Sequence, residues 1–125
     1  MSQQTRPYSW RYTDVRAGDL TVVVIFMYAP VFSARELRRE RAGLPSLLAI
    51  NVAVYQAGKR KHWVFTEYDT GIAERTQWVV GRSSLRQTAA GVHLVVNEKT
   101  VTGEPLQLVM SLTPQTPSGS LVTLS

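Results

Sequence analysis

The chain has 125 residues, a length that predicts one domain with a single hydrophobic core. It carries 14 Lys and Arg against nine Asp and Glu, a formal net charge of +5, and 44% of its residues are hydrophobic. Cysteine is absent, which excludes disulfides, a thiolate nucleophile and a cysteine zinc site, and two separate histidines do not form a metal site. We expect a single domain over 1–125, with tails at 1–7 and 113–125 and no metal or other cofactor.

The longest apolar run and the charge pattern limit the partners. Leu20 to Tyr28 is too short for a membrane span, which needs roughly 18 to 20 residues, and no cationic leader precedes it. Positive charge raises nucleic acid as a partner, but half of the cations fall in two short runs, 35–41 and 59–61, which are typical of solvated faces. Phosphate-binding, dinucleotide and serine-hydrolase motifs are missing. We expect no stable membrane insertion, no nucleic-acid partner and a cytoplasmic location.

The first predicted hairpin joins Tyr8 to Arg16 with Leu20 to Tyr28 through a turn at 17–19. Pairing Arg16 with Leu20 places Trp10 opposite Phe26, and the same register places three further pairs on that side of the ribbon: Tyr8 with Tyr28, Tyr12 with Val24, and Asp14 with Val22. This side is aromatic and apolar with a single acid.

A short helix is predicted next. Pro30 ends the pairing because it lacks an amide hydrogen, and Ser33 with Glu36 has the spacing of a capping box. The helix should run from Ala34 to about Arg41. Its only large apolar side chain is Leu37, so we expect it on the surface or at one end of the domain.

A second hairpin should form from Leu47 to Gln56 and His62 to Tyr68, around a loop at 57–61. With Gln56 facing His62, one face pairs Tyr55 with Trp63, Ala53 with Phe65, and Asn51 with Glu67. That face combines small residues, large aromatics and an amide opposite a carboxylate. The other face is plainly apolar, so both faces are expected to be covered.

The remaining strands are shorter or less regular. We expect weak strands at 71–75 and 77–80, a third hairpin from 84–88 and 92–98 in which Gln87 faces His93, a strand at 106–112, and an edge strand at 121–124. About eight short antiparallel strands and one helix predict an all-β fold, either a small barrel or a sandwich. A barrel is favoured because closure removes exposed edges and leaves room for one small apolar ligand.

Several segments resemble the carotenoid 1,2-hydratase (hydroxyneurosporene synthase) family in order and spacing, over roughly 8–112. They are YSWRYTD at 8–14, LTVVVIF at 20–26, VFS at 31–33, NVAVY at 51–55, WVFTE at 63–67, GRSSL at 81–85 and VVNE at 95–98. The resemblance implies a lipocalin-like (calycin-type) β-barrel with an apolar cavity. It also implies a cofactor-free enzyme acting on a long polyene, either a hydratase or a cyclase that closes a polyketide polyene by a Diels-Alder reaction.

Members of that family usually carry two such barrels, with the substrate near their junction and much of the hydratase acid machinery in the second. The resemblance of this sequence covers only the first. We therefore favour a stand-alone cyclase, a pericyclase of polyketide natural-product or antibiotic biosynthesis, which catalyses an intramolecular [4+2] cycloaddition or a related rearrangement. The substrate would be a hydrophobic polyene small molecule.

A cycloaddition needs mainly shape and a few fixed hydrogen-bond donors. A cavity that holds the reacting ends in a near-attack geometry can supply up to about 7 to 11 kcal/mol, and a donor to a conjugated carbonyl lowers the barrier further. The aromatic walls and small residues predicted for substrate binding are Trp10, Phe26, Tyr28, Ala49, Ala53, Trp63, Phe65 and, from the third hairpin, His93. The residues predicted to act in catalysis are Tyr12, Asn51, Tyr55 and Glu67.

Other interpretations stay open. Hydration would need a buried carboxylic acid, for which Glu67 is the first candidate and Asp14 the second, and a homodimer could rebuild the two-barrel arrangement. Glu67 with Asn51 could equally be a structural polar pair, the aromatics could be core, and His93 could be a structural histidine. A carrier of a hydrophobic ligand would use the same cavity. A solid barrel that binds a protein or nucleic acid through its surface is the last alternative. The substrate-binding interpretations all require a hollow interior.

Overall fold

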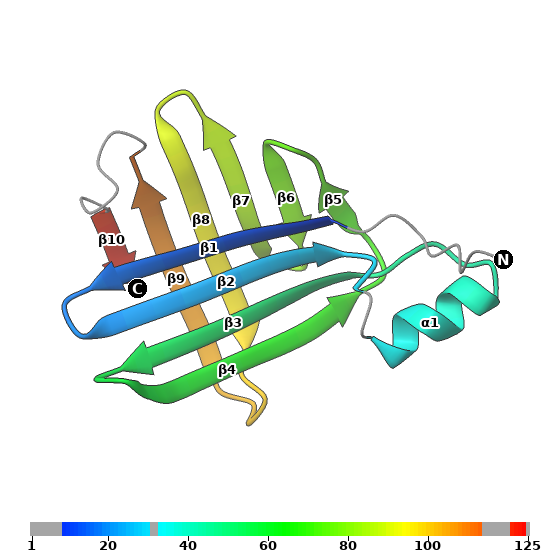
Figure 1. Cartoon of the computed structure of the whole chain (residues 1–125), viewed down its shortest axis with the longest axis horizontal. Helices are drawn as coiled ribbons and strands as arrows, with labels where there is room; N and C mark the ends of the chain where they lie inside the picture. The colour runs from blue at the N-terminus through cyan, green and yellow to red at the C-terminus, as the bar shows by residue number, and fades with distance from the viewer. Residues whose placement is uncertain (1–8, 31–32, 114–120, 125) are drawn as a thin grey trace, which may run out of the picture.

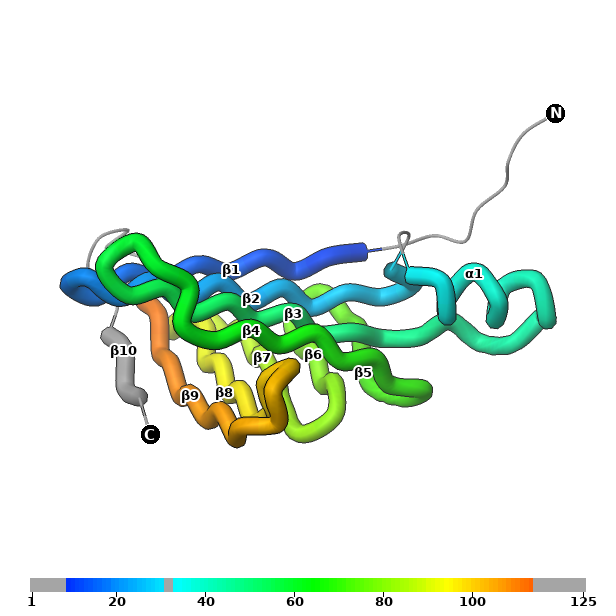
Figure 2. Tube along the Cα trace, turned by 90° about the horizontal axis from the view of Figure 1, so that it is seen from below, coloured from blue at the N-terminus to red at the C-terminus, as the bar shows by residue number. Residues whose placement is uncertain are grey.

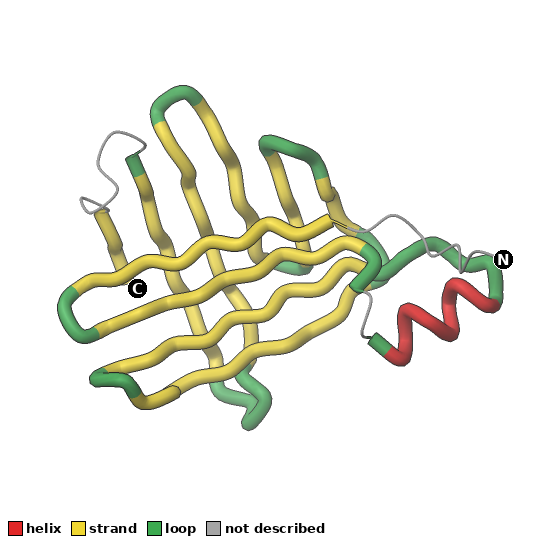
Figure 3. Tube along the Cα trace, viewed as in Figure 1, coloured by secondary structure: helices red, strands yellow, loops and turns green. Residues whose placement is uncertain are grey.

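A computed structural model of the chain describes residues 9–30 and 33–113, together with the backbone of 121–124. Strands make up most of it, as Figure 3 shows in yellow, and the described part has one helix. The start of the first predicted strand at Tyr8, the residues Val31 and Phe32 of the resemblance, and most of the tails lie outside the described residues.

The strands form two antiparallel sheets. The first has the order β1-β2-β3-β4, with bounds β1 (Ser9–Ala17), β2 (Leu20–Tyr28), β3 (Leu48–Gln56) and β4 (Lys59–Tyr68). The second has the order β10-β9-β8-β7-β6-β5, with bounds β5 (Gly71–Ala73), β6 (Gln77–Val80), β7 (Ser83–Thr88), β8 (Gly91–Lys99), β9 (Pro105–Leu112) and β10 (Leu121–Leu124). The all-β antiparallel prediction is therefore confirmed.

The two sheets lie face to face. Their strands cross steeply in Figure 1, and the edge-on view of Figure 2 shows them as two layers, an arrangement typical of orthogonal sheet packing. No strand pairing joins one sheet to the other within the described segments. The closed lipocalin-type barrel therefore stays a prediction.

The core fills the space between the sheets. On the first sheet it is built from alternate residues of β2 and β3, of which Phe26, Ile50 and Val52 are fully buried. The second sheet contributes Leu85, Leu94 and Met110, which are also fully buried. Side chains that alternate with these point to the opposite face of each sheet. The interior that was expected to be hollow is thus the position of the packed core.

The first hairpin is confirmed as a hairpin, but its predicted register is wrong by one residue. Ala17 pairs with Leu20 across a loop of Gly18 and Asp19, so Trp10 faces Met27 and not Phe26. Gly18 has φ +65°, which a side chain would strain, and glycine in the first position suits a two-residue hairpin loop. A slip of one residue moves every partner to the other face.

The second hairpin keeps its predicted faces with different partners. Ala57 and Gly58, with φ of 51° and 78°, form a two-residue loop, and an irregularity follows in the pairing between Val54 and Tyr55. The register shifts by two residues, so Asn51 faces Phe65, and Glu67 faces Ala49. The predicted direct opposition of Asn51 and Glu67 is therefore wrong.

Helix α1 (Ala34–Arg41) has its predicted position and cap. The hydroxyl of Ser33 accepts a hydrogen bond from the Glu36 amide at 3.2 Å. The Glu36 carboxylate is buried and accepts a hydrogen bond from the Leu47 amide at 2.8 Å. This bond ties the helix to the segment that enters β3. Leu37 is exposed, as expected of a surface helix, and Figure 1 shows α1 beyond one end of the first sheet.

Candidate functional site

The face of the first sheet that points away from the core, which we call the outer face, is largely apolar. Pairing aligns its residues in cross-strand rows: Trp10, Met27, Ala49 and Glu67; then Tyr12, Ile25, Asn51 and Phe65; then Asp14, Val23, Ala53 and Trp63. Trp10 and Tyr12 are 49% and 56% exposed, so large aromatic surface meets solvent here. Soluble domains seldom expose a wide apolar patch without a binding role.

A pocket of about 160 Å³ opens on the outer face, and its accessible lining is almost wholly apolar. It is lined by Trp10, Ile25, Met27, Asn51, Trp63 and Phe65. Its lining comes from all four strands, with Trp10 on the edge strand β1 and Trp63 on the edge strand β4. The result is a groove that crosses the sheet between the two tryptophans.

Small residues of β3 lie next to the pocket, although they do not line it. Ala49 and Ala53 lie on either side of Asn51 along the strand, and they are 0% and 4% exposed. Ala53 pairs directly with Trp63, so a methyl group stands beside an indole. Such pairing of small and large residues leaves space above the smaller one.

Asn51 is the one polar side chain among those that line this pocket. Its Nδ2 donates a hydrogen bond to the Val64 carbonyl oxygen at 2.8 Å, which fixes the amide against β4. A donor held in this way needs no reorganisation when it meets a ligand carbonyl with its second N–H.

Glu67 stands at the end of the groove nearest helix α1. The Ser33 hydroxyl donates to its Oε2, and the Arg35 Nη1 lies 3.7 Å from its Oε1. Arg35 and Arg39 also approach Asp69, at 3.6 and 3.7 Å. Both oxygens of Glu67 thus have partners on the helix side, an arrangement suited to holding α1 against the sheet.

The structure brings together most of the predicted site residues. Those on the outer face are Trp10, Tyr12, Ala49, Asn51, Ala53, Tyr55, Trp63, Phe65 and Glu67, as the alternation along each strand and the rows require. Only Trp10, Asn51, Trp63 and Phe65 of this group line the apolar pocket itself.

Three predicted site residues lie elsewhere. Phe26 is in the core, and Tyr28 packs against the core on the same side of β2. His93 is exposed on β8 of the second sheet, where its Nδ1 lies 3.1 Å from the Ser111 hydroxyl. The prediction that these three share one site with Trp10 is therefore wrong.

Two pocket residues, Ile25 and Met27, were missed because β2 is apolar on both faces, so its sequence does not reveal which face is outside.

A polar cluster around Glu98 was also missed. The Tyr68 hydroxyl donates to Glu98 Oε1 at 2.7 Å, and the Ser83 hydroxyl donates to Glu98 Oε2 at 2.9 Å. Burial, followed by the hydrogen bond to Glu98, raises the pKa of Tyr68 to about 12.

The described residues offer neither a metal-binding cluster nor a membrane-spanning helix. They contain no group of three or more His, Cys, Asp or Glu side chains that could hold a metal ion. In the same part of the chain, no helix has both the length and the apolar character needed to cross a bilayer.

Comparison with known proteins adds no relative. No family model matches the chain, and neither the curated proteins nor the solved structures give a significant match.

Proposed function

We propose that this protein binds an extended apolar small molecule in the groove of the outer face, between Trp10 and Trp63. The apolar pocket beside these tryptophans is the observation that carries the proposal. Aromatic side chains give a large contact area at little cost in conformational entropy.

The size of the pocket limits what it can hold alone. Its volume of about 160 Å³ is close to that of an engineered cavity of about 150 Å³ that binds benzene, and below the roughly 300 to 1,000 Å³ of typical ligand pockets. A polyene would therefore place one segment in the pocket and lay the rest along the outer face. The side of the polyene that faces away from the sheet would contact water or a partner protein. A second copy of the chain is one such partner.

The reaction proposed for this site is the cofactor-independent cyclisation of a polyketide polyene, as the resemblance to lipocalin-like cyclases implies. The groove offers what a cycloaddition uses, namely shape and one amide donor, Asn51. Tyr12 and Tyr55, on the same face, are further candidate donors.

Hydration of a double bond is the rival reaction. It needs an acid free to protonate an alkene, and Glu67 is engaged by Ser33 and Arg35 at one end of the groove. This arrangement favours cyclisation over hydration. A carrier that binds without any conversion is the remaining alternative.

The proposal is tested by filling the groove. Ala53→Phe should place a ring beside Trp63, and the new side chain should exclude the ligand. We expect the affinity for retinol to fall at least about tenfold. Binding is measured by the quenching of tryptophan fluorescence. Ala89→Phe, in the turn between β7 and β8, is the matched control and should bind as the wild type does. Undiminished binding by a folded Ala53→Phe variant would contradict the site.

The reaction is tested separately by incubation with linear polyene substrates and mass spectrometry. Cyclisation leaves the mass unchanged and alters retention, whereas hydration adds one water. Glu67→Gln should retain cyclisation within about tenfold because positioning supplies most of the rate. Recovery of unaltered substrate would contradict both reactions and favour a carrier that binds without conversion.

A further inference from the structure

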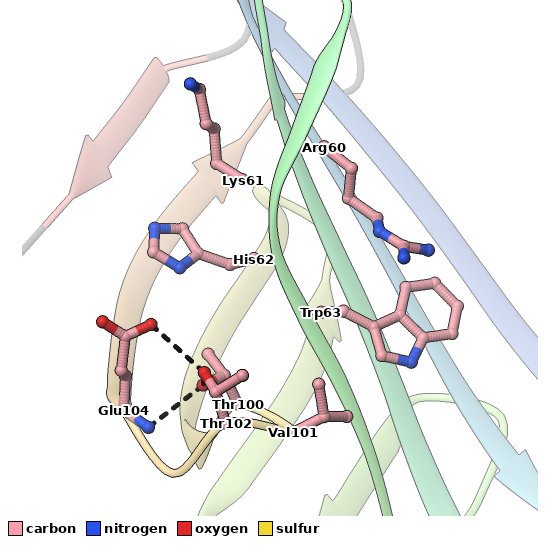
Figure 4. Close-up of a pocket in the computed structure, with 8 residues that line it drawn as sticks. All are labelled: Arg60, Lys61, His62, Trp63, Thr100, Val101, Thr102 and Glu104. Carbon is pink, nitrogen blue, oxygen red and sulfur yellow. Dashed lines mark hydrogen bonds between the residues drawn. The ribbon is translucent and has the colours of Figure 1, made fainter.

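A second pocket adjoins the apolar one at Trp63. Its volume is about 220 Å³, and it is lined by Arg60, Lys61, His62, Trp63, Thr100, Val101, Thr102 and Glu104. Figure 4 shows Arg60 and Trp63 on one side of β4, Lys61 and His62 on the other, and residues of the loop between β8 and β9 beside them. The Val101 amide donates to the Trp63 carbonyl oxygen at 3.0 Å, which holds that loop along the edge of β4.

The two pockets differ in character. The first is almost wholly apolar, whereas the second is mainly polar and contains cations and hydroxyl groups. Trp63 lines both. One molecule that follows the outer face past this indole therefore passes from an apolar into a positively charged environment.

Among the described residues, the cations of this pocket have no acidic partner. Arg60 lies over the Trp63 ring at 4.8 Å from its centroid, and no carboxylate among the described residues forms an ion pair with Arg60 or Lys61. Arg35 and Arg39, at the other end of the sheet, are by contrast paired with Asp69. The acid of the pocket, Glu104, is exposed and accepts from the Thr102 hydroxyl at 3.3 Å.

His62 adds a polar group to this pocket. Its Nδ1 is buried and finds no hydrogen-bond partner among the described residues, although the ring lines this pocket. A buried polar atom left unbonded destabilises the structure, so a ligand oxygen that bonds it would remove that cost. Two threonine hydroxyls, of Thr100 and Thr102, lie in the same pocket.

We infer that the ligand of the outer face is an apolar molecule with an anionic end, a free carboxylic acid in its ionised form, whose carboxylate binds at the edge of β4 between Arg60 on one side of the strand and Lys61 on the other. The inference rests on the proposed function and names its ligand class. The apolar body lies in the groove against Trp63 and Phe65, and the guanidinium over Trp63 marks the point where the chain meets its charged end. Charge-assisted hydrogen bonds at this end fix the direction in which the molecule lies.

The experiment compares cis-parinaric acid, a fluorescent conjugated polyene acid, with its methyl ester, each titrated as monomer into the full chain. We expect the acid to bind about tenfold more tightly than the ester, which is the size of one charge-assisted hydrogen bond. Arg60→Gln and Lys61→Gln should each reduce this ratio, and the double variant should bring it to about one. Arg75→Gln, an exposed cation between β5 and β6, is the control and should leave the ratio unchanged.

The outcomes separate the inference from the function. Equal affinity of the wild type for acid and ester overturns the inference but leaves the proposed function standing, since both probes are bound. Failure of both probes to bind overturns the proposed function. Sedimentation with phosphatidylglycerol vesicles that depends on Arg60 and Lys61, without binding of the monomeric acid, would assign these cations to a lipid surface and overturn the inference.

Discussion

Tyr68 joins the edge of the first sheet to the second sheet through one carboxylate. Its hydroxyl and that of Ser83 bond the two oxygens of Glu98, which is 6% exposed. The Ser83 hydroxyl also accepts from the Asn97 amide at 3.0 Å. A buried carboxylate is tolerated because both of its oxygens are bonded. The cluster depends on the exact placement of the phenol ring.

Gly81 is the residue that leaves space for that ring. A Cβ at this position would lie 2.4 Å from Tyr68 Cζ, whereas a Cβ at Gly18 would meet nothing within 4 Å. Both glycines have similar positive φ, +60° and +65°, so alanine at either position should cause similar backbone strain. We predict that Gly81→Ala lowers the free energy of unfolding by about 1 to 3 kcal/mol more than Gly18→Ala does. Urea denaturation measures the difference, and equal losses would contradict this packing.

The raised pKa of Tyr68 gives a pH test. The neutral phenol is favoured in the fold, with a pKa of about 12 against 10 for the free side chain. Its stabilising effect should be complete below pH 10 and decline as pH rises through about 12. Wild type should therefore be more stable than Tyr68→Phe at pH 9, and the difference should shrink between pH 10 and 12. Chemical denaturation across this range checks it, and a difference that grew with pH would show that the phenolate is the favoured form.

At the scale of elements, helix α1 is held by its beginning. Ser33 caps the helix through the Glu36 amide and donates to Glu67 of β4, while the Glu36 carboxylate accepts from the Leu47 amide. The helix has little apolar surface to bury, because its large apolar residue, Leu37, is 46% exposed. Polar contacts at its first turn thus hold the helix in place, whereas most helices in proteins are held by the packing of an apolar face.

Replacing the cap should loosen this element. Ser33→Ala removes the acceptor for the Glu36 amide and the donor to Glu67, and we predict a loss of about 1 to 2 kcal/mol in the free energy of unfolding. Ser33→Thr keeps the hydroxyl and should lose much less. Hydrogen exchange should show faster opening of the α1 amides in the alanine variant alone. Similar stability of the alanine and threonine variants would mean that the cap does not hold the helix.

The strands show what the sequence predicted and what it did not. Alternation is clear in β3 and β4, so Asn51, Ala53 and Trp63 were assigned to one face correctly even though the pairing was off by two residues. In β2 both faces are apolar. The predicted hairpin loop was one residue longer than the observed loop, which placed Phe26 on the wrong side of the strand. The hydrophobic pattern of β2 fits either side, so it did not reveal the error. The aromatic side of β1 was expected inside, yet Trp10 is outside.

At the scale of the whole molecule, the first sheet has two apolar faces with different roles. One packs on the second sheet and forms the core; the other carries the groove. The sequence pattern shows that both faces of this sheet are apolar, but it does not show that the second sheet covers only one of the two faces. The hollow interior was predicted for this reason, whereas the apolar pocket beside the tryptophans lies outside the sandwich.

The location of a bound ligand is therefore the central claim, and methyl NMR tests it most directly. Ile25 and Met27 line the outer pocket, whereas Ile50 and Met110 belong to the core between the sheets. Titration with cis-parinaric acid should shift the methyl resonances of Ile25 and Met27 and give them nuclear Overhauser contacts to the polyene, with those of Ile50 and Met110 nearly unchanged. Contacts to Ile50 and Met110 without contacts to Ile25 and Met27 would place the ligand between the sheets and contradict the account.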